Sequence, residues 1–362
     1  MNRIIIIIPI LSIVIPLKKI QAANYSIWSG AAQGNIRTVG MGGAMTGLAD
    51  NYSGAVDNPA GLALTMPSGS LQISQSAVTD TLQMAPGTSM DGYSLGFAVR
   101  LGETAGAANF SYSTPFLSTS NTGEVLQLKE YLLNYSRVFF DRKLSLGISG
   151  ALDQAQLPTQ SVYQVRPIFG ALYRFPNRIF LGASYTPASL IGPDNQGRDF
   201  SLPHILAVGT SWIPNRFFRA AFSFQTIPAE TNTYRFFLPT ESVGTNPAYQ
   251  YHLGLSYVFL SLKKLRVEIL AGSYFEASRS TDFLNPTNPG TPSRLHFTGG
   301  IEVQPWIFKV AVGVDEAPGY QNIVLALGVA ADALVEKLHI LPSHLHAPSG
   351  GLLPNPIEIS DD

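Results

Sequence analysis

Apolar and polar residues alternate along several segments of the chain, which is the pattern of β-strands with two unlike faces. In residues 92–101 the apolar face consists of Tyr93, Leu95, Phe97, Val99 and Leu101. The opposite face consists of Ser94, Gly96, Ala98 and Arg100. The same alternation returns in residues 144–150, 249–259 and 295–304. Gly, Ser and Ala dominate the second face, which favours a crowded, watery lumen over a solvent surface rich in Lys and Glu.

This pattern predicts an all-β fold, a transmembrane antiparallel β-barrel of about 14 strands. The predicted strand centres lie near residues 73, 97, 109, 133, 147, 169, 182, 207, 221, 254, 269, 299, 310 and 326. Each strand with its connection takes about 19 residues, which suits membrane strands of about 10 residues. The two packed sheets of a β-sandwich would also alternate, but their outer face would be charged.

The connections between the predicted strands alternate in length. Long connections are expected at residues 78–91, 114–127, 188–201, 227–247 and 276–293. Tight turns are expected near residues 102–103, 140–142, 176–177, 214–215, 260–263 and 304–305. The connections at residues 154–161 and 316–319 are short, although their place in the strand order puts them on the side of the long connections. Long outer loops and short periplasmic turns are typical of outer-membrane barrels. The even strand number then predicts that both termini are periplasmic.

The first residues have the features of an export signal. Arg3 precedes an apolar run at residues 4–17, and Ala22 is a small residue of the kind that precedes cleavage. We therefore predict a signal peptide at residues 1–22. The alternative is a membrane anchor, but the run is shorter than the roughly 20 residues that a spanning helix needs.

Composition agrees with a membrane environment. Only 13% of the residues are charged and the formal net charge is -1, whereas soluble domains contain about 25% charged residues. The balance lacks the basic excess that a nucleic-acid partner requires. There is no Cys, which excludes disulfides and thiolate metal sites. We predict no cofactor and no metal, and interpret the low charge as the result of strands that face lipid.

Residues 23–66 differ in composition from the predicted strands: they are rich in Gly and Ala and show no two-residue alternation. They end in a turn signal, Asn58-Pro59-Ala60-Gly61. We predict that this segment folds as short helices and forms a hatch inside the barrel. The alternative is a flexible periplasmic leader. The resulting division is signal 1–22, hatch 23–66, barrel 67–331 and a periplasmic C-terminal tail at 332–362.

Two stretches resemble the FadL/TodX-type outer-membrane transporters of long-chain fatty acids and aromatic hydrocarbons. The first comprises residues 39–44, residues 48–50 and the Asn58–Gly61 turn, and is similar to the N-terminal hatch of that family. The second covers residues 170–185 with 202–212, and is similar to strands in the middle of its barrel. The resemblance implies a plugged 14-stranded barrel. It also implies passive uptake of a hydrophobic solute, released sideways into the bilayer near a kinked third strand.

The candidate site residues fall into two sets. The hatch or gate set consists of Gly40, Gly42, Gly43, Asn58, Pro59, Ala60 and Gly61. The ligand-binding set consists of Phe110, Tyr112, Phe116 and Leu117 near the expected exit, with Phe236 and Phe237 in a long connection. Each set has a structural alternative. The glycines would simply allow close packing, Phe110 and Tyr112 would face lipid, and residues 234–238 would extend their flanking strands. Lumenal arginines are expected to form ion pairs.

No enzyme motif is present, neither a nucleophile elbow nor a metalloprotease or phosphate-binding signature. We therefore predict a channel, not an enzyme. Its expected partners are a hydrophobic ligand, outer-membrane lipid and the barrel-assembly machinery, with no nucleic acid. The rival function is a non-transporting outer-membrane barrel that scaffolds secretion or surface-protein attachment. The chain also ends without the terminal aromatic residue common in such barrels.

Overall fold

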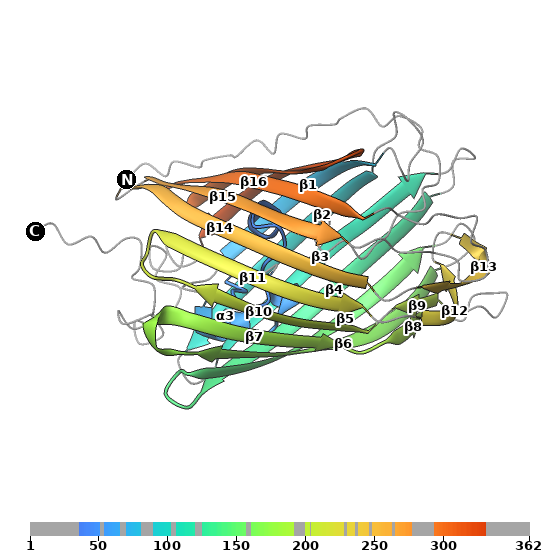
Figure 1. Cartoon of the computed structure of the whole chain (residues 1–362), viewed down its shortest axis with the longest axis horizontal. Helices are drawn as coiled ribbons and strands as arrows, with labels where there is room; N and C mark the ends of the chain where they lie inside the picture. Colours follow the sequence, from blue (N-terminus) through green and yellow to red (C-terminus); the bar gives the residue numbers. More distant parts are fainter. Residues whose placement is uncertain are drawn as a thin grey trace, which may run out of the picture.

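The barrel is closed and antiparallel, and each of its strands pairs with two neighbours (Figure 1). The computed structural model describes residues 36–50, 54–65, 70–80, 90–102, 106–119, 125–156, 161–191, 200–202, 204–227, 230–235, 238–245, 248–262, 265–276 and 293–330. The predicted signal peptide and C-terminal tail lie outside these residues. Fourteen strands form the barrel, in the order β1-β18-β17-β16-β15-β14-β11-β10-β7-β6-β5-β4-β3-β2.

Every predicted strand centre falls inside one of the barrel strands, so the predicted fold class is confirmed. The first seven strands are β1 (Ser70–Asp80), β2 (Met90–Gly102), β3 (Gly106–Thr119), β4 (Val125–Phe139), β5 (Leu144–Gln156), β6 (Ser161–Arg174) and β7 (Ile179–Thr186). The others are β10 (Ile205–Trp212), β11 (Phe218–Ile227), β14 (Ala248–Leu262), β15 (Leu265–Glu276), β16 (Arg294–Pro305), β17 (Phe308–Ala317) and β18 (Tyr320–Ala330).

The two faces of the strands are as unlike as the alternation predicts. In β14 the side chain of Leu253 is 49% exposed, whereas its neighbour His252 is 3% exposed. The outward residues of β2, including Tyr93, Leu95 and Phe97, are likewise exposed. Because successive strand residues point to opposite faces, the exposed set forms a continuous apolar outer surface and the buried set lines the lumen.

Aromatic side chains gather at both ends of the outer surface. Toward the short turns, Trp212 packs edge-on against Phe218, with ring centroids 6.1 Å apart. Toward the long connections, Tyr112 lies 5.0 Å from Tyr131. Such rings suit the interface between hydrocarbon and water, where one end of the side chain is apolar and the other wet.

The short turns occur where the sequence predicts them, for example between β4 and β5 and between β16 and β17. The 3₁₀ helix η2 (Pro176–Arg178) forms the turn between β6 and β7. The predicted long connections are partly wrong, because β3 and β4 extend through residues assigned to the connection at 114–127. Pairing continues there from Phe116 opposite Leu128 to Thr119 opposite Val125.

Two other long connections also contain strands, which corrects the prediction of plain loops. Residues 188–201 contribute β8 (Ser189–Ile191) and part of β9 (Phe200–Leu202), and residues 227–247 contribute β12 (Glu230–Arg235) and β13 (Leu238–Thr245). They form a separate four-stranded sheet, β13-β12-β9-β8, at one end of the barrel (Figure 1). Because β12 and β13 pair with each other, they do not extend β11 and β14 as barrel strands.

Three short helices precede β1 in the chain: α1 (Ile36–Gly40), α2 (Gly54–Asp57) and α3 (Gly61–Thr65). They lie inside the barrel, as the blue ribbon of Figure 1 shows. We call the described part of this segment, residues 36–50 and 54–65, the plug. Among the described residues, no helix is both long and apolar enough to cross a membrane.

Candidate functional site: the plugged lumen

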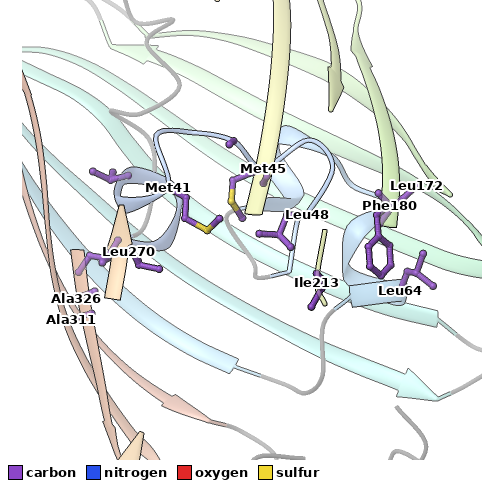
Figure 2. Close-up of a cluster of buried hydrophobic side chains, with 14 of the residues drawn as sticks. Met41, Met45, Leu48, Leu64, Leu172, Phe180, Ile213, Leu270, Ala311 and Ala326 are labelled. Carbon is purple, nitrogen blue, oxygen red and sulfur yellow. The ribbon is translucent and has the colours of Figure 1, made fainter. Parts of the chain in front are cut away.

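An apolar cluster joins the plug to the barrel wall (Figure 2). Met41, Met45 and Leu48 of the plug are fully buried. They share this cluster with the wall residues Leu172, Phe180, Ile213, Leu270, Ala311, Val324 and Ala326, among others. Burial of apolar surface contributes about 25 cal/mol per Å². The cluster therefore stabilises the packing of the plug against the barrel wall, although most of the wall residues are distant from the plug in sequence.

The gate glycines sit where the plug touches the wall. Gly42 and Gly43 have φ of 60° and 73°, a left-handed conformation in which a side chain is strained. A Cβ on Gly42 would lie 2.9 Å from the backbone nitrogen of Ser273, and one on Gly40 would lie 2.8 Å from Cβ of Leu270. The imidazole of His252 contacts the Gly42 carbonyl oxygen through Nδ1, at 2.6 Å. Close packing therefore accounts for these glycines.

The wall has its own glycines at matching places, which the sequence shows only as small residues on the lumenal face. A Cβ at any of them would overlap plug backbone or the Asn58 side chain. They are Gly147, Gly170, Gly182, Gly209, Gly254 and Gly272. Several are direct cross-strand partners, such as Gly182 opposite Gly209 and Gly254 opposite Gly272. They form a groove around the lumen that accepts plug backbone.

The Asn58–Gly61 turn fastens the second half of the plug. The Asn58 amide nitrogen donates to the carbonyl oxygens of Thr46 at 2.7 Å and Ala171 at 3.1 Å. Its oxygen accepts from the Ala60 backbone nitrogen at 3.1 Å. Ser145 then donates to the Ala60 carbonyl at 2.7 Å, and Asn134 to the Pro59 carbonyl at 3.3 Å. One side chain thus ties both halves of the plug to the wall.

Replacing Asn58 by alanine should loosen α2 and α3 without unfolding the barrel. The change leaves the Thr46 carbonyl without this donor in a buried place, which costs about 1–3 kcal/mol. Hydrogen exchange of the α3 amides, read by mass spectrometry, should speed up about 5- to 150-fold. The control is Gln154→Ala, whose hydrogen bonds go to Ser161 and Tyr163 in the wall. Unchanged α3 exchange in Asn58→Ala would contradict this role.

Buried ion pairs fasten the first half of the plug. The Arg37 guanidinium binds both carboxylate oxygens of Asp50, at 2.7 and 2.8 Å. It also binds Glu268 of β15 at 2.7 Å. Arg219 and Arg266 reach the same Glu268 carboxylate at 2.9 and 2.7 Å. The predicted pairing of lumenal arginines is confirmed for Arg219 and Arg266. The plug takes part in the same network through Arg37 and Asp50.

One partly buried acid in α2, Asp57, predicts that seating of the plug depends on pH. Burial raises the pKa of Asp57 to about 7, while an exposed aspartate has a pKa near 3.9. The seated plug therefore holds a proton that the released plug gives up. Seating is strongest below about pH 4 and weakens progressively until about pH 7.

Asp57→Asn should remove this dependence, because the amide carries no titrating proton. Hydrogen exchange of the α2 amides, corrected for the intrinsic effect of pH, should rise between pH 4 and pH 7 only in the natural chain. The same rise in Asp57→Asn would assign the pH effect to another group.

The predicted exit strand carries a bulge. In the pairing of β3 with β4, Ser113 lies opposite Glu130 and Phe116 opposite Leu128, so Thr114 and Pro115 share one partner position. Pro115 has no backbone N–H to donate to the sheet. An extra residue in one strand bends it locally. The kink that the family resemblance implies for the third strand therefore has a counterpart at Thr114 and Pro115.

Four of the six predicted ligand residues lie on one strand, β3. Phe110 lies on the outer face of β3, where its side chain is 43% exposed, and Tyr112 lies on the same face. The backbones of Phe116 and Leu117 pair with β4 beyond the bulge. Phe236 and Phe237 lie outside the described residues. The ligand set thus remains a prediction, in which Phe110 and Tyr112 border the bulge from the outer side.

Sequence reasoning missed a layer of polar residues on the lumenal face between the plug and the long connections. His252 and His296 are predicted as separate strand residues, yet the fold brings their rings onto the two faces of Tyr274. Glu130, Asp153 and Arg166 form a buried ionic group on the opposite wall. Strand parity signals that such residues face inward, but not which of them meet.

The solved structures with this arrangement settle the fold. The Pseudomonas putida toluene transporter TodX superimposes with a TM-score of 0.59 at 13% identity, covering 83% of this chain and 99% of TodX. This chain has the TodX fold. A Pseudomonas aeruginosa FadL homologue gives 0.59 at 11% identity, covering 82% and 98% of the two chains. The monoaromatic hydrocarbon channel CymD gives 0.55 at 15% identity, covering 82% and 97%.

No family model and no curated protein matches the chain by sequence. The likeness to the TodX fold therefore rests on the superposition of structures. The resemblance noted from the sequence rests on a few short motifs. The two matching structures TodX and CymD are a toluene transporter and a monoaromatic hydrocarbon channel.

Proposed function

We propose that the chain is an outer-membrane channel for the passive uptake of hydrophobic compounds, long-chain fatty acids or similar. In this proposal the plug rearranges, and the solute leaves sideways through the wall near the β3 bulge. The observation that carries the proposal is a plug seated inside a closed barrel that has an apolar outer surface. The toluene transporter TodX and the hydrocarbon channel CymD share this fold.

Physical chemistry favours a lateral path for such solutes. A hydrophobic solute gains about 25 cal/mol per Å² when its surface leaves water, so a watery pore through the whole barrel offers it little. In this proposal lipid surrounds the barrel and contacts outward-facing side chains such as Phe97, Phe110 and Leu133. The break in pairing at Thr114 and Pro115 is a place where the wall is already disrupted.

Plug movement is the second part of the proposal. The seat contains an apolar cluster, an ion-pair network and wall-to-plug hydrogen bonds such as those from Ser211 to the Gly47 carbonyl at 2.6 Å and from Ser145 to the Ala60 carbonyl at 2.7 Å. Hydrogen bonds can be exchanged for bonds to water when the plug shifts, so each contributes only about 1 kcal/mol net. The hydrogen bonds of the seat therefore oppose plug movement by only a modest free energy.

Uptake by cells tests the proposal. Gram-negative cells with and without the chain receive four probes with one body: butylbenzene, 4-butylphenol, 4-butylbenzylamine and 4-butylbenzoate. We expect faster entry of at least one probe when the chain is present. Mass spectrometry of gently extracted protein should also find a retained apolar ligand. Equal entry of all four probes with and without the chain would refute transport, and co-purification with secretion components would then favour the scaffold function.

A further inference from the structure

A layer of polar side chains lines the lumen between the plug and the long connections; we call it the polar layer. On β14, Gln250 lies nearer the long connection than Gly254, which touches Met41 of the plug. On β15, Glu276 lies beyond Gly272, and on β16, Arg294 and His296 precede Thr298, which donates to the Gly40 carbonyl. A solute travelling from the long connections to the plug must pass this layer.

One side of the polar layer is a stack of rings bound to acids. The Tyr274 ring lies 5.4 Å from that of His252 and 4.1 Å from that of His296, nearly parallel to both. The Tyr274 hydroxyl donates to Asp315 at 2.8 Å. His296 contacts the other Asp315 oxygen through Nδ1 at 2.9 Å, and Glu276 through Nε2 at 3.4 Å. Arg294 binds Glu276 at 3.1 Å.

Several buried acceptors in this layer have no hydrogen-bond partner among the described residues. His252 is one of them, because a carbonyl can only accept and Nδ1 must therefore donate to Gly42. The neutral ring then has a lone pair on Nε2, which has no partner. The amide oxygen of Gln250 also has none, and neither the amide oxygen nor the amide nitrogen of Asn322 has one; these side chains are 3% and 0% exposed. The lone pair of His252 and the oxygen of Gln250 favour a ligand that donates hydrogen bonds.

The charge of the layer points the same way. On the opposite wall, Arg166 binds Glu130 at 2.5 Å and Asp153 at 3.0 Å. Among the described side chains, the layer thus holds four carboxylates, on Glu130, Asp153, Glu276 and Asp315, and two guanidinium groups, on Arg166 and Arg294. With all four carboxyl groups ionised, its net charge is −2 when both imidazoles are neutral and zero when both are protonated.

We infer that the polar layer selects amphipathic solutes, in which an apolar body carries a hydroxyl or amino group, and rejects carboxylates. This inference rests on the proposed function: it keeps the passive uptake of hydrophobic compounds and replaces fatty acids as the solute class by amphipathic hydrogen-bond donors. A hydroxyl or ammonium group donates to the unpartnered acceptors and is tolerated or attracted by the carboxylates. A fatty-acid carboxylate brings a further negative charge to a layer in which carboxylates outnumber guanidinium groups, so it is repelled. A plain hydrocarbon leaves the acceptors unpaired.

The four alkylbenzene probes test the inference, because they share one body. We expect 4-butylphenol and 4-butylbenzylamine to enter at least about tenfold faster than 4-butylbenzoate, in the range that a charged passage gives. We expect butylbenzene to lie between them. If the benzoate or butylbenzene enters fastest, the inference is wrong and the proposed function stands. If no probe depends on the chain, the proposed function fails first.

Variants locate the selectivity in the layer. Glu276→Gln removes one negative charge and should raise benzoate entry relative to the amine severalfold. Glu302→Gln is the matched control, since Glu302 is another buried lumenal glutamate, paired with Lys309 at 2.7 Å toward the short turns. The double variant Glu276→Gln with Arg294→Gln keeps the net charge and should keep the selectivity. Equal shifts in Glu276→Gln and Glu302→Gln would overturn the assignment.

Folding must be checked for each variant by heat-dependent gel mobility. If Glu276→Gln does not fold, Asp153→Asn on the opposite wall replaces it and carries the same expectation. Asp153→Asn that folds with unchanged selectivity would equally overturn the assignment.

Discussion

Replacing Arg37 by glutamine should unseat the plug and make the barrel conduct ions. Arg37 is the link between the plug and the buried carboxylate of Glu268 on β15. Without the guanidinium, the ion pair that Asp50 retains among the described residues is with Arg219, at 3.8 Å. Removing one partner of a buried ion pair costs about 3–5 kcal/mol, which shifts the balance between seated and released plug by a factor of about 100 or more.

Single-channel recording in planar bilayers measures this effect. The natural chain is expected to stay closed for most of the record, and Arg37→Gln to open frequently or permanently. Arg266→Gln is the matched control, because Arg266 binds the same Glu268 carboxylate at 2.7 Å from within β15. It removes the same charge from the same partner without touching the plug. Equal conductance in both variants would mean that the plug does not depend on the Arg37 link.

Deleting Thr114 should abolish lateral release while leaving the barrel folded. The deletion removes the extra residue of the β3 bulge, so that Ser113 to Phe116 can pair one-to-one with Glu130 to Leu128. Without the extra residue the ladder lacks only the N–H of Pro115 at this place, so the wall opens there less readily. We expect entry of every probe that depends on the chain to fall at least about tenfold, the loss that about 1.4 kcal/mol on the opening step produces.

The chain offers a matched control for this deletion. The pairing of β14 with β15 is shifted between Val258 and Leu260, which makes Phe259 the extra residue of a second bulge. Deleting Phe259 removes that bulge in a wall far along the sheet from β3. We expect its uptake to be nearly natural. Full uptake after deletion of Thr114 would show that solutes do not leave at the β3 bulge.

Much of the architecture follows from local patterns. Alternation with a period of two decides which face of the strand each residue occupies, as in residues 249–259. This alternation is enough to predict most of the membrane strands from sequence. Where polar and small residues interrupt the pattern, the prediction of strands fails. Residues 114–119, 189–191 and 238–245 read as connections, yet pairing with neighbouring strands makes them strands. Strand formation there depends on partners that a local window does not contain.

The candidate site divides in the same way. The sequence points to the hatch glycines and to the Asn58 turn, because positive φ and tight turns leave residue signatures. It gives no sign that Gly182 faces Thr46, or that His252 and His296 enclose Tyr274. Those contacts arise from closing the sheet, which brings β14, β15 and β16 together around one lumen.

The sequence by itself therefore determined the barrel, its number of strands and the two chemistries of their faces, because each follows from residues near one another in the chain. Only the tertiary structure decided what the lumen holds. Arg37 and Glu268 are 231 positions apart, and no period or spacing connects them. Their pairing results from a closed wall and a plug whose buried charges must be neutralised inside it. The same closure brings together the charged side chains of the polar layer.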